Sequence, residues 1–246
     1  MKHRYLHTLL ASLTALAIAS CATDTLPQSQ EGGSGGPLTL WAEIEQLAVT
    51  RVNDEGFADG DRMGVYVVDY EGDQPGTLRV NGNRANNVQH TLDAATGTWS
   101  PASPIYWKDK HTHVDIYSYY PMGHPQSIDL YPFDVQADQS QEASEAGMGS
   151  YEASDFLWGK SADMAPTTSS IHMAMHHRLA CARVTLVMGE GFNAEGWAGM
   201  EKSLQLTNLV RKSTIDLATG IVTPRGEPEK TDTKHLHTGN SQTPHM

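Results

Sequence analysis

The sequence predicts an all-β sandwich fold, and three observations support this prediction. Short segments in which apolar and polar residues alternate recur along the chain, and turn-forming residues separate them. No stretch sustains the 3.6-residue apolar period of an amphipathic helix. The turn at residues 93–97 (DAATG) recurs at residues 216–220 (DLATG). Short strands joined by such turns are typical of packed antiparallel sheets.

The first expected strands follow from period-two alternation and from β-forming residues. Residues 38–44 place three apolar side chains on one face of a strand. Residues 62–70 are rich in β-branched and aromatic side chains. Residues 87–92 and 97–100 flank the first DxATG turn, so we expect them to form a hairpin.

The same pattern continues toward the C-terminus. Residues 113–120 alternate Val114 and Ile116 against Asp115 and Tyr117. The remaining expected strands are residues 130–135, 171–175, 180–188, 203–210 and 213–217. Polar, Ser/Glu/Gly-rich residues 138–154 predict a long loop.

The N-terminus has the composition of an export signal. Lys2 and Arg4 precede an apolar stretch at residues 9–19, and Ile-Ala-Ser leads directly to Cys21. The run of about 11 apolar residues is shorter than the roughly 20 that span a bilayer. We therefore interpret residues 1–20 as a lipoprotein signal peptide and expect Cys21 to carry the lipid. The alternatives are an ordinary signal peptide with a chance cysteine, or a single membrane anchor.

Composition divides the rest of the chain into four parts. Residues 21–37 are polar and Gly-rich and are expected to form a flexible tether. Residues 38–170 are expected to form an N-terminal β-sandwich domain, and residues 171–223 a second, incomplete β domain. Residues 224–246 are expected to be a polar, disordered tail.

The net charge and the cysteine content limit the classes of function that we expect for this protein. The formal net charge is −12, and an acidic surface of this kind disfavours binding to nucleic acid. The chain contains two cysteines. If Cys21 is lipidated, Cys181 has no partner for an intramolecular disulfide, and we expect its thiol to be a small, buried apolar group. A role for Cys181 as nucleophile or metal ligand is the alternative.

Several polar and aromatic residues are candidate functional groups. The chain has twelve histidines, and the pairs His111/His113, His172/His176 (with His177 adjacent) and His235/His237 have the spacing of same-face neighbours. They show no recognisable zinc-site spacing. We find no phosphate-binding loop. We expect no enzyme, cofactor or metal. The aromatic stretch at residues 117–121 and Trp107 were considered for stacking on sugars.

The ordered set of motifs resembles one family. The export signal and spacer precede Val49-Thr50-Arg51, and the remaining motifs are FADGDRMGVY (57–66), WSPASPIYW (99–107), VDIYSYYP (114–121), DQS (138–140), SDFL (154–157) and HRLACARVT (177–185). Their order and spacing are similar to those of the fimbrillin family of Bacteroidetes, the pilin-like lipoproteins of surface fimbriae.

The resemblance implies a fold and a function. It implies a transthyretin-like β-sandwich domain followed by a second one, which is incomplete here. It also implies export to the outer-membrane surface as a lipoprotein, with palmitate on Cys21 as the membrane anchor. A protease would then cut after Arg51 and remove residues 38–44, and a strand from another fimbrial subunit would fill the vacated position. Alternatively, Arg51 is a solvent-facing residue of a subunit that keeps its lipid.

The sequence is compatible with three functions. The first is a fimbrial subunit, or an accessory lipoprotein of fimbriae, that takes part in adhesion and contacts host or bacterial surface ligands. The second is a non-polymerising surface lipoprotein that binds glycans through Tyr117 or Trp107. The third is a lipid-anchored hydrolase. The short second domain reflects truncation or a frameshift after residue 223, completion by another subunit, or a short variant.

Overall fold

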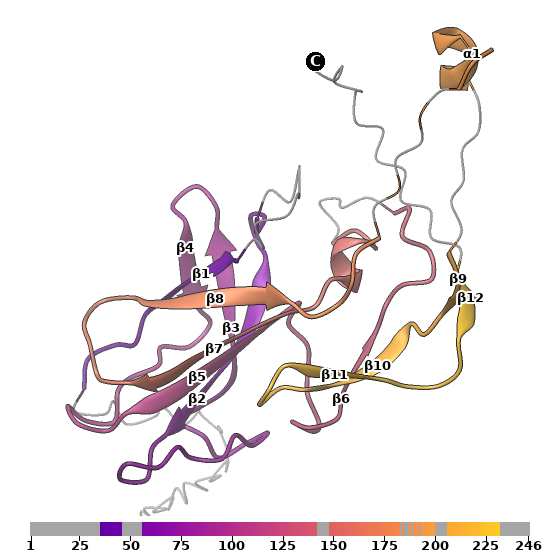
Figure 1. Ribbon diagram of the computed structural model, residues 1–246. Helices are drawn as coiled ribbons and strands as arrows, with labels where there is room; N and C mark the ends of the chain where they lie inside the picture. Colours follow the sequence, from indigo (N-terminus) through magenta and orange to yellow (C-terminus); the bar gives the residue numbers. More distant parts are fainter. Residues whose placement is uncertain are drawn as a thin grey trace, which may run out of the picture. The chain divides into compact units, whose positions relative to one another are not determined.

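The regular structure is almost entirely β-strand, as the alternating pattern predicts (Figure 1). This computed structural model describes residues 35–45, 56–141, 148–182, 184, 187, 189–191, 193–199 and 206–231, all within one unit, Gly32–Met246. The strands are β1 (Leu40–Ile44), β2 (Arg62–Asp69), β3 (Ala85–Asp93), β4 (Thr98–Pro101), β5 (Val114–Tyr120), β6 (Tyr131–Asp134), β7 (Leu157–Met164), β8 (Ile171–His177), β9 (Leu206–Leu209), β10 (Lys212–Asp216), β11 (Ile221–Pro224) and β12 (Glu229–Thr231). The described helical segments are the 3₁₀ helix η1 (Glu152–Ser154) and α1 (Ala194–Gly199).

The main sheet has seven strands in the order β1-β8-β7-β5-β2-β3-β4. Its neighbours pair antiparallel except for β1, which runs parallel to β8. The sheet curls so that its two end strands come into contact. The indole Nε1 of Trp99 on β4 donates a hydrogen bond to the Ala42 carbonyl oxygen on β1, at 3.4 Å. Figure 1 shows β1 and β4 at the same corner of the molecule.

The first core fills the inside of this curled sheet. It is built from inward-facing residues of all seven strands, with Leu38, Ile105 and Trp107 from the adjoining segments. Strands β2 and β5 are buried along almost their whole length. Both faces of these two strands must therefore be shielded from water, not only the face toward the first core. This explains why residues 62–70 have few polar side chains.

A second core covers the outer face of β2, β5 and β7. It joins Tyr66, Tyr119 and Trp158 of the main sheet to Phe133 and Ile215 of a three-stranded sheet in the order β11-β10-β6. The Trp158 Nε1 donates to the Leu217 carbonyl oxygen at 2.8 Å. The two sheets thus form a sandwich in which the central strands of the larger sheet are the shared layer.

The two DxATG turns have the same local structure, as the repeated motif predicts. In each turn the aspartate Oδ1 accepts a hydrogen bond from the main-chain N–H two residues later, at 3.0 Å for Asp93 and 2.8 Å for Asp216. Each turn ends on a glycine at positive φ, 67° at Gly97 and 70° at Gly220. A residue with a side chain is strained in this conformation, so glycine closes both hairpins.

Some expected elements differ from the structure. The described residues between 180 and 188 lie outside any strand, so the strand expected there is wrong. Strand β7 lies outside the strands expected from the alternating pattern. Strand β8 pairs with the strands that precede it, and β6 pairs with β10. The division into two domains between residues 170 and 171 stays a prediction. Glu229–Thr231, within the expected tail, pairs with β9 as β12. In the described part of the chain, no helix is long and apolar enough to cross a bilayer.

Candidate functional site

Strand β1 is the element with the clearest functional potential, because it lies at one end of the main sheet. Its parallel ladder with β8 runs from Leu40 opposite Ile171 to Ile44 opposite Met175. The Ile171 N–H donates to the Thr39 oxygen, and the Glu45 N–H donates to the Met175 oxygen, both at 2.9 Å. Removal of β1 would leave the backbone groups of β8 that face it without partners.

The residues just before β1 cross a second segment. The Leu38 N–H donates to the Ile105 oxygen at 2.8 Å, and the Trp107 N–H donates to the Gly36 oxygen at 3.1 Å. A Cβ on Gly35 would collide with the Trp107 side chain, so this crossing requires glycine. Residues 35–45 therefore form one continuous segment that binds at two places.

The inner face of β1 contributes to the first core. Leu38 and Leu40 are only 2% and 4% exposed, and Ala42 and Ile44 pack against the same cluster. Burial of one leucine side chain contributes about 1.5–3 kcal/mol. A strand that replaced β1 would need apolar side chains at the same alternate positions.

The outer face of β1 is joined to β8 by side chains. The His172 Nε2 lies 2.9 Å from Glu43 Oε1, and the His176 Nδ1 lies 3.1 Å from Glu45 Oε2. The Trp41 ring stacks on the His172 imidazole with centroids 4.0 Å apart. The expected same-face placement of His172 and His176 is confirmed, and their partners are Glu43 on β1 and Glu45 directly after it.

The other edge of β1 faces β4 without a ladder. Among the described residues, the Trp99–Ala42 hydrogen bond links these two strands. Phe57 packs edge-on against Trp99, with ring centroids 5.0 Å apart. Arg51 and Cys21 both lie outside the described residues.

The other histidines contribute to separate contacts. His113 pairs with Asp163 at 2.7 Å, and His177 pairs with Asp155 at 2.8 Å. His235 and His237 lie outside the described residues. Within the described ranges, no group of three or more His, Cys, Asp or Glu side chains is placed to hold a metal ion.

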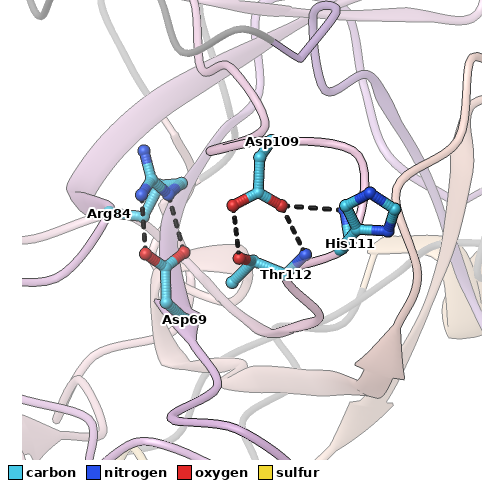
Figure 2. A network of polar contacts seen from close by, with 5 residues as sticks. All are labelled: Asp69, Arg84, Asp109, His111 and Thr112. Atoms are coloured by element: carbon cyan, nitrogen blue, oxygen red, sulfur yellow. Dashed lines mark hydrogen bonds and ion pairs between the residues drawn. The ribbon is translucent and has the colours of Figure 1, made fainter.

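A polar network beside the ends of β2 and β5 stabilises two loops (Figure 2). Arg84 binds Asp69 through two hydrogen bonds of 2.6 Å each. The Asp109 carboxylate accepts the main-chain N–H groups of His111 and Thr112, and these lower the pKa of Asp109 to about 2. Because His111 contributes its main-chain N–H to this bond, the network fixes a loop and does not form a catalytic pair.

The structure removes the basis of the sugar-stacking alternative, and the expectation of a buried Cys181 thiol is wrong. Tyr117 and Trp107, the candidates for stacking on sugars, are 6% and 1% exposed because they belong to the two cores. Cys181 is exposed, since its segment lies outside the described strands, and its Sγ lies 3.5 Å from the Tyr151 hydroxyl. Neither the glycan hypothesis, as based on those aromatics, nor a buried thiol is supported.

Comparisons with known proteins agree with this architecture. A putative cell adhesion protein from Bacteroides ovatus has a TM-score of 0.52 and 13% identity over 80% of this chain and 70% of its own. A second one from Bacteroides uniformis has the same TM-score and 20% identity over 83% and 71%. These likenesses show the fold. No curated protein matches significantly.

The family model described as fimbrillin-like matches residues 50–245, which is most of the chain and begins just after β1. This match confirms the resemblance seen in the sequence motifs. The chain therefore belongs to the fimbrillin-like family, and this membership indicates a fimbrial surface protein with a structural role.

Proposed function

We propose that this chain is a structural subunit, or an accessory lipoprotein, of bacterial surface fimbriae that assembles by strand exchange and takes part in adhesion. It is exported with a lipid on Cys21 and reaches the outer-membrane surface. A cut after Arg51 then separates β1 from the rest of the fold, and a strand of another subunit takes the place of β1 beside β8.

One observation carries this proposal. Among the described strands, β1 is an end strand that pairs in a ladder with β8 alone, and the candidate cut site lies seven residues after it in the sequence. Loss of β1 would expose the backbone edge of β8 and the positions of Leu38 and Leu40 in the core. An incoming strand would restore both the ladder and the apolar contacts, as in β-augmentation.

Cleavage and assembly are tested together. The full chain is treated with a protease that cuts after arginine, and the products are separated by gel electrophoresis without boiling. We expect ladders of multimers from the parent chain and monomers from Arg51→Ala. Exposed Arg62 provides the matched control, and Arg62→Ala should still assemble. Ladders from Arg51→Ala, or monomers from the cleaved parent chain, would refute strand exchange.

Lipidation is tested separately. We expect mass spectrometry of the exported protein to find a diacylated or triacylated N-terminal Cys21, and Cys21→Ala to lose its association with membranes. Two or more acyl chains anchor a protein stably, at about 0.8 kcal/mol per buried methylene. An unmodified N-terminus at or near Cys21 would overturn the lipoprotein assignment and leave the assembly test unaffected.

A further inference from the structure

We propose that His172 and His176 on β8 select the strand that pairs with them, by binding two carboxylates spaced two residues apart on its outer face. The partner is an extended segment of another subunit with apolar residues at alternate core-facing positions and acidic residues between them. This inference rests on the proposed strand exchange and specifies the partner that the exchange accepts.

The contacts of β1 show how such a segment is bound. Glu43 and Glu45 are two residues apart, so both side chains leave the same outer face of the strand. Their carboxylates lie within 3.1 Å of the imidazole nitrogens of His172 and His176. An imidazole N–H donates to a carboxylate in either charge state of the ring, so both pairs form hydrogen bonds.

The histidine spacing also fixes register. The side chains of His172 and His176 are four residues apart on one face of β8, and Ala174 lies between them. Trp41 sits directly opposite His172 and stacks on its ring, so Glu43 reaches His172 diagonally. A shift of the incoming strand by one residue would turn the carboxylates toward the first core, where they would lose water without gaining a partner.

The apolar contacts alone are less selective. Many extended segments have apolar side chains at alternate positions, whereas the carboxylates of Glu43 and Glu45 add a charge requirement on the outer face of the strand. The histidine pair therefore favours a segment that carries two carboxylates at this spacing over other segments with the same apolar pattern.

The first test uses the intact full chain and does not depend on cleavage. Hydrogen exchange of the β1 amides is measured in Glu43→Gln/Glu45→Gln, in His172→Gln/His176→Gln and in the fourfold variant. We expect roughly fivefold faster exchange in each double variant and little further increase in the fourfold one, since both remove the same exposed pairs. His113→Gln, which breaks the His113–Asp163 pair elsewhere, is the matched control and should leave β1 unchanged. Unchanged exchange in the double variants, or fully additive effects, would overturn the pairing.

The second test measures selection. The full chain cut after Arg51 is incubated with two synthetic peptides, residues 35–45 and the same peptide with both glutamates replaced by glutamine. We expect the acidic peptide to be incorporated about fivefold more than its glutamine analogue, and His172→Gln/His176→Gln to abolish this preference. Equal incorporation by the parent chain would overturn selection by carboxylates. If neither peptide enters the cut chain, strand exchange itself fails, and the hydrogen-exchange result still decides whether the histidines hold β1.

Discussion

His90 is a titratable side chain in the interior of the main sheet. It is 1% exposed, its Nδ1–H donates to the Val88 oxygen at 3.2 Å, and its Nε2 has no hydrogen-bond partner among the described residues. Burial lowers the pKa of His90 from 6.5 to about 4. Between these two pH values the unfolded chain binds a proton at His90 and the native chain does not, so acidification favours unfolding.

The first prediction concerns this pH dependence. Between pH 7 and pH 5, His90 should cost the native state about 2 kcal/mol of unfolding free energy. His90→Gln, which keeps a donor for Val88, should remove most of that loss. Urea unfolding of both proteins at the two pH values measures the difference. Parallel losses in the two proteins would show that His90 does not titrate as proposed.

Asp115 is a buried carboxylate whose partners come from three directions. Lys160 lies 2.8 Å away, the Tyr70 hydroxyl donates at 3.1 Å, and the Asp163 N–H donates at 2.9 Å. Burial opposes ionisation of this group, but the contacts with Lys160 and Asp163 outweigh it and hold the pKa of Asp115 below its usual value. The negative charge of Asp115 is therefore stabilised in the core by the ammonium group of Lys160.

The second prediction follows from this dependence. Lys160→Met should lower the unfolding free energy by about 2 kcal/mol, less than for a fully buried pair because the ammonium is partly exposed. Asp115→Asn/Lys160→Met should recover part of the loss, since the amide needs no counter-charge. Denaturant unfolding of the two single variants and the double variant checks this. A double variant as unstable as the sum of the singles would exclude the coupling.

At the scale of elements, the close approach of β7 to β8 depends on a glycine. A Cβ on Gly159 would lie 2.5 Å from the Ala174 oxygen and 2.9 Å from the Met175 sulfur. As the third prediction, Gly159→Ala should destabilise the fold by about 1–3 kcal/mol, because one of the two strands must shift. Gly36, with open space around its Cα, is the control, and Gly36→Ala should change stability by less than about 0.5 kcal/mol. Thermal unfolding of the two variants measures both effects, and equal midpoints would contradict the steric argument.

The elements also show what the sequence could and could not predict. Strands such as β2 and β5, and the two DxATG turns, were predictable because local pattern and turn chemistry determine them. Strand β7 was not predictable, because Leu157 and Trp158 are buried on opposite faces of the sheet. The residues that follow them in β7 do not alternate between apolar and polar side chains. The spacing of His172 and His176 predicted a shared face. Their glutamate partners could not be predicted, since β1 and β8 pair across more than a hundred residues.

For the molecule as a whole, the second core makes the two sheets of the sandwich interdependent. Ile215 of β10 is fully buried among Tyr66, Tyr119 and Trp158 of the main sheet and neighbouring residues of the same cluster. The three-stranded sheet has short strands, and three strands with one apolar face are close to the minimum for stability. We therefore infer that the small sheet and the centre of the large sheet unfold together.

The fourth prediction tests this cooperativity. Ile215→Ala should lower the unfolding free energy by about 2–4 kcal/mol through the cavity it leaves. Amides of β5, on the other sheet, should lose hydrogen-exchange protection by the same amount as those of β10, because both exchange through one unfolding event. Ile221→Ala, at an exposed site on β11, should change neither. If β10 alone loses protection, the small sheet unfolds independently. In that case the main sheet, which includes β5 and holds β1, would stay folded after the small sheet has unfolded.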